Sequence, residues 1–482
     1  MRPPKNMAVR SSLIGWLLLA VAGCGRAGSA TDERRAAAAP APVVTDVAAD
    51  REVEADDEAL DNELIPRLER LRKRGQFNQF VDATLAAAET EAPDAALQLL
   101  KAEALLAIGR HEAAGEVALA AGQLALASDD LPAAGQSLKL FAVARFRERQ
   151  PLDDPIFDAV LARLPADDQA ADLLRFWRGA IAQRVPYQLD SSASEPAEVQ
   201  ARPSSPTALC AIEARANEVL QPLVFIDTGA QHSLMTTAAA RRARVTIGET
   251  ATQLVGFAGL HARPGVLETL QLGGLTLHNV PILVGDAAPL VALNGQMTLG
   301  TELMHHVRFT VDYPAERVLA EPADGDGSVA ESESNWQIPL WTFSQACLVQ
   351  GRTASGAGAR LLVDTGNRTG TFVSARWARR NLPRYQPPDA GLVFKFKQRD
   401  LKIETLEFGD QSLDDWPVVD MLPGSLERLD LVDVLVGHDL LRSYRVTLDV
   451  ARRTLLLQGN LPPTAPAQER VDNLEASRDG GN

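Results

Sequence analysis

The sequence predicts a multidomain α + β protein, in which an N-terminal α-helical repeat domain precedes two pseudo-symmetric all-β lobes. Two internal repeats and one change in the spacing of apolar residues predict this fold class. A 34-residue repeat lies in an Ala- and Leu-rich segment, residues 63–184. A 137-residue repeat relates residues 185–322 to residues 335–460. Near Arg184 the helical spacing of apolar residues gives way to short β-rich runs separated by turn residues.

Apolar residues of the first segment recur at helical spacing, as at Leu64 and Leu68. Gly75 in "RGQF" and Gly109 in "IGRH" lie 34 residues apart. Two helices per 34 residues, with Gly near the turn, resemble tetratricopeptide repeats, and this resemblance implies a domain that docks a protein substrate, partner or regulator. The alternative is an irregular helical bundle, because Ala-rich helices match loose repeat templates easily.

The N-terminus predicts a lipoprotein signal peptide over residues 1–24. Basic residues precede an apolar run, 13–22, which rises only about 15 Å as a helix and is too short to span a bilayer. "VAGC" resembles a bacterial lipobox, which implies that Cys24 is lipid-modified and anchors the chain at the periplasmic side of the cell envelope. Gly25 next to it would then direct the chain to the outer membrane. The alternative is an ordinary signal in which Cys24 is incidental.

The composition and charge of the chain exclude some classes of binding partner. The net charge of −15 without a basic stripe excludes a nucleic-acid partner. With no second apolar run of spanning length, membrane contact is expected through the lipid anchor only. Residues 25–62, rich in Ala, Pro and acidic side chains, predict a flexible acidic linker, and residues 461–482 predict a disordered tail.

The 137-residue repeat extends well beyond one motif. "FIDTGAQHSLM" (225–235) aligns with "LVDTGNRTGTFV" (362–373). "LGTELMHHVRFTVD" (299–312) aligns with "VGHDLLRSYRVTLD" (436–449). The agreement over both segments excludes chance, so the two β-rich lobes are copies of one unit.

Each copy carries Asp-Thr-Gly after an apolar run and hydrophobic-Gly 73 residues later, from Asp227 to Gly300 and from Asp364 to Gly437. This pattern resembles the retropepsin-like aspartic proteases, over nearly all of 185–460. The resemblance implies a small closed β-barrel in each lobe, a tandem arrangement like that of pepsin, and an aspartic endopeptidase acting on a peptide or protein substrate.

Such chemistry needs two carboxylates, here Asp227 and Asp364, that converge on one water. Like charges a few Å apart do not both ionise easily, so the pair shares one proton. The ionised member acts as general base and the protonated member donates to the scissile carbonyl oxygen. Which residue takes which role stays open, because the pair titrates together. The route uses no metal, and no cofactor is expected.

Neighbouring residues are expected to support the two active-site loops. The glycines after each Asp-Thr pair allow the backbone to approach the partner loop, and the threonines resemble those that lock the loops together. The second copy is one residue longer before Thr371 than the first copy is before Ser233. The expected supporting residues are Thr228, Gly229, Thr365, Gly366, Gly300 and Gly437.

A mobile flap is expected between each Asp and its Gly partner. "VGFAGLHARPG" (255–265) has suitable glycines, so Gly256, Phe257 and Gly259 are the flap candidates. The matching segment, 393–400, has no glycine, so we expect one working flap.

Two other residue types, histidine and cysteine, are candidates for sites. His305 and His306 have no metal-ligand spacing and are interpreted as surface or packing residues rather than a metal site. Cys210 and Cys347 occupy equivalent places in the repeat. They form either an inter-lobe disulfide or two separate buried thiols.

The predicted function is that of an envelope-anchored aspartic endopeptidase. Two alternatives remain at this point. One is a non-catalytic peptide-binding module that uses the two carboxylates for hydrogen bonding. The other is a periplasmic scaffold in which the helical repeat domain carries the function.

Overall fold

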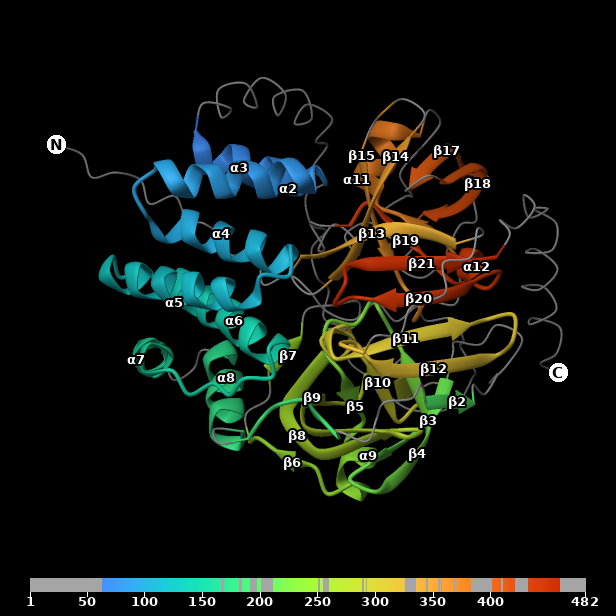
Figure 1. The fold of residues 1–482 in the computed structure, drawn as a ribbon, viewed down its shortest axis with the longest axis horizontal. Helices are drawn as coiled ribbons and strands as arrows, with labels where there is room; N and C mark the ends of the chain where they lie inside the picture. Colours follow the sequence, from blue (N-terminus) through green and yellow to red (C-terminus); the bar gives the residue numbers. More distant parts are fainter. Residues whose placement is uncertain are drawn as a thin grey trace, which may run out of the picture.

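A computed structural model of the chain (Figure 1) describes most of the predicted folded region. The predicted signal peptide, linker and tail, together with Cys24, Cys210, Gly256, Phe257 and Gly259, lie outside the described residues. The described residues are 63–165, 169–181, 184–190, 197–200, 211–249, 252–254, 260–287, 290–291, 293–325, 335–343, 346–353, 356, 358–367, 370–382, 401–408, 411–420 and 432–459.

A stack of helices forms the N-terminal part, here called the helical region (Figure 1). The turns after α2 and α4 contain Gly75 and Gly109, whose positive φ angles of 71° and 79° suit glycine. Asp94, Asp130 and Asp154 cap three of the helices by accepting hydrogen bonds from first-turn amides. The likeness to tetratricopeptide repeats stays a prediction. The helices are α2 (Leu64–Lys73), α3 (Phe77–Thr90), α4 (Ala95–Ala107), α5 (His111–Ala127), α6 (Leu131–Arg147), α7 (Pro155–Arg163) and α8 (Gln169–Ala180).

Strands of lobe 1 close into a barrel with the order β4-β10-β5-β9-β8-β3, in which β3 pairs back with β4. β1 and β6 extend the sheet, and β7 pairs with β8. The elements of lobe 1 are β1 (Gln188–Leu189), β3 (Ala211–Ala216), β4 (Val219–Ile226), β5 (Leu234–Met235), α9 (Thr237–Arg242), β6 (Thr246–Ile247), β7 (Thr252–Leu254), β8 (Leu260–Leu272), β9 (Leu275–Val284), β10 (Met297–Leu299) and the 3₁₀ helix η1 (Leu303–His305).

Lobe 2 repeats this barrel in the same order, β15-β19-β16-β18-β17-β14, with β14 pairing back to β15. The elements of lobe 2 are β13 (Asn335–Phe343), β14 (Ala346–Thr353), β15 (Gly358–Val363), β16 (Phe372–Val373), α11 (Ala375–Asn381), β17 (Leu401–Phe408), β18 (Gln411–Asp420), β19 (Val434–Val436), α12 (His438–Leu441), β20 (Arg445–Asp449) and β21 (Thr454–Gln458). The predicted fold class, a helical region followed by two pseudo-symmetric β lobes, is confirmed.

A sheet between the lobes joins them through β11 (Val307–Asp312) of lobe 1 and β20 of lobe 2, which pair antiparallel. β12 (Arg317–Pro322) and β2 (Ala197–Gln200) continue it on one side, and β21 and β13 on the other. Thr310 and Thr447, equivalent in the repeat, share a hydroxyl hydrogen bond of 2.8 Å. The buried guanidinium of Arg308 pairs with Asp449 of the other lobe at 3.2 Å. The two lobes therefore form one body.

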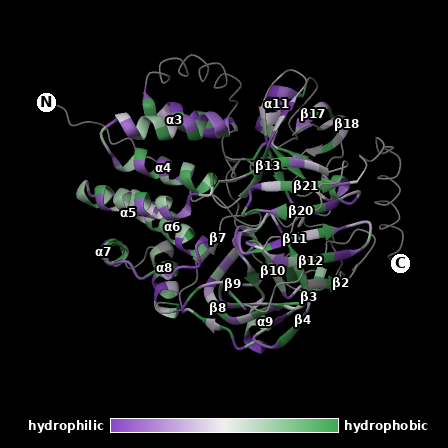
Figure 2. Ribbon diagram, in the orientation of Figure 1, coloured by the Kyte–Doolittle hydropathy of each residue, from purple (hydrophilic) through white to green (hydrophobic). Residues whose placement is uncertain are grey.

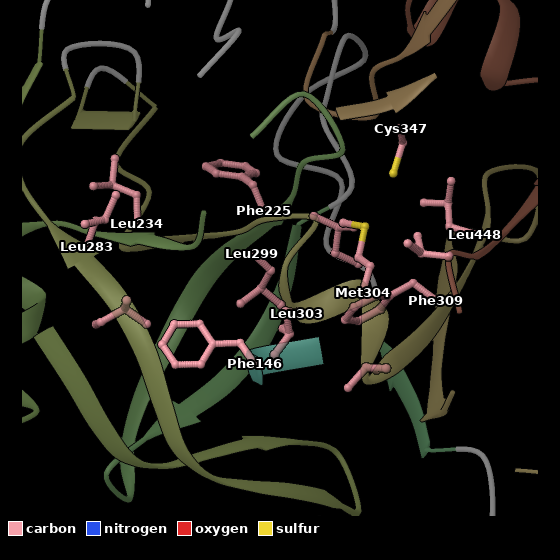
Figure 3. Close-up of a cluster of buried hydrophobic side chains, with 14 of the residues drawn as sticks. Phe146, Phe225, Leu234, Leu283, Leu299, Leu303, Met304, Phe309, Cys347 and Leu448 are labelled. Atoms are coloured by element: carbon pink, nitrogen blue, oxygen red, sulfur yellow. The ribbon is translucent and has the colours of Figure 1, made fainter. Parts of the chain in front are cut away.

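The helical region packs on both lobes through buried apolar side chains. The ribbon coloured by hydropathy shows hydrophobic residues along the helices and along the strands of both lobes (Figure 2). Phe77 of α3 lies against Trp341 and Phe343 of β13, with ring centroids 5.6 and 4.6 Å apart. On the side of lobe 1, Phe146 of α6 belongs to the same buried cluster as Leu303 (Figure 3). Because these aromatic faces are shared, the helical region stabilises the lobes as well as itself.

His305 and His306 are packing residues, buried between the helical region and lobe 1. The ring of His305 lies edge-on to His111 of α5 at 5.8 Å, and the ring of His306 stacks on Tyr187 at 4.4 Å. Burial, and secondarily the charges of Arg147 and Arg149, hold the pKa of both imidazoles well below the ordinary value. The interface is therefore built from neutral histidines.

Phe77→Ala is expected to lower the free energy of unfolding by about 3–5 kcal/mol, because it empties the shared aromatic cluster. Urea unfolding followed by tryptophan fluorescence measures this. The control is Leu220→Ala, at a side chain that is 45% exposed, with an expected change within about 0.5 kcal/mol. Equal effects of the two changes would contradict the shared core.

Acidification is expected to destabilise this interface. The folded pKa of His305 lies below the unfolded value of about 6.5, so below that pH the unfolded chain binds the extra proton. Stability is therefore present above pH 6.5 and lost as the pH falls, by up to about 1.4 kcal/mol per pH unit for each such histidine. Urea midpoints at pH 7.5 and 5.5 should differ less in His305→Gln than in the wild type. An unchanged difference would refute the assignment.

Candidate active site

The two Asp-Thr-Gly loops meet at the junction of the lobes. The first DTG loop (residues 227–233) follows β4, and the second (residues 364–371) follows β15. Strand β10 runs parallel to β4, and Asp227 N donates to the carbonyl of Leu299 at its end, at 3.0 Å. The copy in lobe 2 does the same, with Asp364 N donating to Val436 at 2.9 Å. The repeat thus places both aspartates at equivalent strand ends.

The threonines lock the two loops together by reciprocal hydrogen bonds. Thr228 N donates to Thr365 Oγ1 at 3.1 Å, and Thr365 N donates to Thr228 Oγ1 at 3.0 Å. Each hydroxyl in turn donates to the carbonyl that precedes the other aspartate: Thr365 Oγ1 to Ile226 at 2.8 Å, and Thr228 Oγ1 to Val363. All these groups are buried, so the four hydrogen bonds hold the loops in one register.

Glycine is required after each threonine because the opposite carboxyl group lies against the backbone there. A Cβ atom on Gly366 would come within 2.4 Å of Asp227 Cγ. A Cβ atom on Gly229 would come within 2.8 Å of Asp364 Cγ. Each lobe therefore supplies one carboxyl group and the surface on which the other carboxyl group rests.

Backbone amides orient the carboxyl groups. Asp227 Oδ1 accepts from Gly229 N at 2.9 Å and Ala230 N at 3.1 Å, and Asp364 Oδ1 accepts from Gly366 N at 2.9 Å. The two Oδ2 atoms are buried without a hydrogen-bond donor among the described residues. Both carboxyl side chains are 0% exposed and lie within hydrogen-bond reach of each other.

Burial raises the pKa of both aspartates, and the charge of Asp227 raises the pKa of Asp364 further. The amide hydrogen bonds favour the ionised forms but do not offset the loss of solvation. The pair therefore retains one shared proton well above the pH at which a free aspartate loses its own.

The two hydrophobic-Gly turns support the loops from behind. A Cβ on Gly300 would lie 2.9 Å from Ala230 O, and a Cβ on Gly437 would lie 2.7 Å from Gly370 O. Thr301 N donates to Ala230 O, and His438 N donates to the carbonyl of Asn367, both at 2.8 Å. These contacts hold each hydrophobic-Gly turn against the DTG loop of its own lobe.

An acidic residue behind each loop is a part of the site that the sequence interpretation missed. Glu302 Oε1 accepts from Ser233 N, and Asp439 Oδ2 accepts from Thr371 N at 3.1 Å. Burial raises the pKa of Glu302 to about 7. The signal was present in "GTE" and "GHD", where an acidic residue follows each glycine at the same offset. Thr371 lies one residue later in its loop than Ser233, and its amide donates to Asp439 as that of Ser233 donates to Glu302.

The described residues include only part of the predicted flap and of the predicted cysteine pair. Strands β7 and β8 pair antiparallel on either side of residues 255–259, and the flap itself stays a prediction. Cys347 is buried, and burial raises the pKa of its thiol to about 12. Whether Cys347 pairs with Cys210 stays a prediction, because Cys210 lies outside the described residues.

In the part of the chain that the structure describes, no cluster of three His, Cys, Asp or Glu residues is arranged to hold a metal ion. In the same part, every helix is too short or too polar to cross a membrane.

Comparisons with known proteins agree with the geometry of lobe 1. Residues 212–303, from β3 to the Gly300 turn, match the family model described as Aspartyl protease. A search of curated proteins found no match. The chain thus carries an aspartyl protease domain after an N-terminal helical region.

Three solved structures resemble the chain. An aspartic proteinase from Irpex lacteus is 13% identical, with 57% of this chain and 99% of that chain covered and a TM-score of 0.37. Basic 7S globulin from soybean is 12% identical over 57% and 96%, with a TM-score of 0.32. Conglutin gamma from lupine seeds is 13% identical over 55% and 96%, with a TM-score of 0.33.

Asp227→Asn is expected to stabilise the protein at neutral pH. Because the folded pKa of both aspartates is raised, their contribution is present below about pH 4 and is lost as the pH rises through the folded values. Asparagine keeps the amide contacts and removes one buried charge, so the gain at pH 7.5 should be about 1–3 kcal/mol. Thermal unfolding at pH 7.5 and 4 measures it. An equal loss of stability at both pH values would contradict a strained carboxyl pair.

Proposed function

We propose that the chain is an aspartic endopeptidase in which Asp227 and Asp364 activate one water molecule. The observation that carries this proposal is the reciprocal Thr228–Thr365 lock, which brings one buried carboxyl group from each lobe to a common point. A carboxyl pair held this rigidly is prepared for proton transfer, since small displacements of the reacting groups cost large factors in rate.

The geometry supports a two-step hydrolysis. The ionised carboxylate takes a proton from water as the water oxygen bonds to the scissile carbonyl carbon, and the protonated carboxyl donates its proton to the carbonyl oxygen. A proton then passes to the amide nitrogen as the C–N bond breaks, which releases a carboxylic acid and an amine. The amides of Gly229 and Gly366 hold the Oδ1 atoms, and the Oδ2 atoms are left for the proton and the water.

One observation favours a non-catalytic role for the carboxyl pair. Both aspartates are 0% exposed, so in this arrangement neither water nor a peptide reaches their carboxyl groups. A protein that keeps this arrangement would retain the carboxyl pair as a structural element of the lobe junction.

We further propose that the enzyme acts in the cell envelope, held by a lipid on Cys24. The support is the apolar run and "VAGC" sequence of residues 1–24. Docking of a protein substrate or partner on the helical region is also a proposal. Mass spectrometry of the mature N-terminal peptide tests the anchor, and a Cys24→Ala chain found in the same membrane fraction would contradict it.

Cleavage of an unfolded protein by the purified chain should fall about 10²–10⁴-fold in Asp227→Asn and equally in Asp364→Asn, because each removes half of the proton-transfer pair. The raised pKa of the pair should extend activity from about pH 3 towards neutral, with the alkaline limb above the ordinary aspartate value near 4. Initial rates over pH 3–8 measure both effects.

The control for this assay is Asp190→Asn, which alters a partly exposed carboxylate paired with His278 and should leave the rate unchanged. Activity that survives in both dyad variants would reveal a contaminating enzyme. A folded wild type that cleaves none of several substrates would instead favour the binding module.

A further inference from the structure

We infer that the helical region is a working part of the catalytic unit, and that Trp177 of α8 is a positioning residue for the first DTG loop. This inference rests on the proposed function. The inference extends the proposed function by assigning a role in catalysis to a segment outside the two lobes.

Trp177 touches two parts of lobe 1 at once. Its side chain is 3% exposed, and its ring centroid lies 5.8 Å from that of His232 in the first DTG loop. Its indole nitrogen lies 3.4 Å from the carbonyl oxygen of Gly265 in β8, a polar contact longer than an ordinary hydrogen bond. One side chain of the helical region therefore connects the loop that carries Asp227 with the strand that borders it.

The helix that carries Trp177 fits closely against lobe 1. A Cβ atom on Gly248 would lie 2.9 Å from the ring of Phe176 and 2.9 Å from Pro264. Gly248 N donates to Pro264 O at 2.8 Å, which keeps the two segments together under the helix. No space therefore remains for even a methyl group at Gly248, so α8 packs in close contact with this surface.

His232 transmits this contact to the aspartate. Its carbonyl carbon lies 2.6 Å from where a Cβ of Gly300 would be, and the next amide, Ser233 N, donates to Glu302. The first DTG loop is thus contacted both by the Gly300–Glu302 turn and by Trp177. Burial lowers the pKa of His232 to about 3, so its ring is neutral above that pH and suits contact with an aromatic side chain.

Lobe 2 has a tryptophan that contacts its DTG loop from within the lobe, and lobe 1 has none at the equivalent position. Trp416 of β18 donates its indole N–H to Thr371 Oγ1 at 3.0 Å and so braces the second DTG loop from within the lobe. The alignment of "LDDWPVV" with "LHNVPIL" places Val280 at the equivalent position of lobe 1. The first loop has no such tryptophan in its own barrel, and the helical region supplies one.

The test compares Trp177→Ala with Trp177→Phe in the full chain. Trp177→Ala should lower kcat about tenfold or more and leave KM within about twofold, because the loop is displaced rather than the substrate contacts. Trp177→Phe keeps an aromatic ring on His232 and should recover kcat to within about threefold. The matched control is Phe157→Leu, a buried ring of α7 that packs on Phe141 within the helical region and should leave kcat unchanged.

Amide hydrogen exchange gives a second readout that does not depend on activity. Trp177→Ala should speed exchange about tenfold in residues 229–233. The internal reference in lobe 2 is the amides of Thr371 and Ser374, which donate to Asp439 and Asp433 of the same lobe and not to the first loop. Unchanged kcat and exchange would overturn the inference, and so would equal acceleration in both loops or a similar loss of kcat in Phe157→Leu. If the wild type cleaves nothing but exchange responds in the first loop alone, the positioning role stands and the proposed function fails.

Discussion

The structure depends on the reciprocal hydrogen bonds between Thr228 and Thr365. They bury two hydroxyls and two amides at the junction of two lobes, and the loss of either partner leaves its counterpart unsatisfied in a medium of low dielectric. The inter-lobe sheet, in which Thr310 meets Thr447, brings the lobes to the separation that these hydrogen bonds require. Gly229 and Gly366 remove the side chains that would otherwise keep the loops apart.

This junction is electrostatically costly. Two carboxyl groups lie out of water within reach of each other, and burial raises the pKa of both. The surrounding fold must offset that cost, and it does so with apolar packing. The buried aromatic cluster of Phe77, Trp341 and Phe343 and the cluster around Phe146 both run from the helical region into the lobes, so the helices add to the stability of the part that carries the carboxyl pair.

Much of the site could be predicted because the chain contains it twice. An Asp-Thr-Gly motif alone is a common turn, but the second copy with its own glycine 73 residues on makes the alignment unambiguous. The residues behind the loops were harder to recognise. Glu302 and Asp439 differ in type, and their partners Ser233 and Thr371 lie one residue out of register, so neither pair stands out until the hydrogen bonds are seen.

The sequence by itself determined the order of the parts, the two-copy architecture and the pair of aspartates, because each of these is written as a local pattern that repeats at a constant interval. Only the tertiary structure decided where the helical region packs, that His305 and His306 are buried, and that Trp177 reaches the first loop. These contacts join residues 55 or more positions apart that share no repeat, as Trp177 and His232 do. Their complementarity lies in shape and burial, which a linear pattern of residue types does not encode.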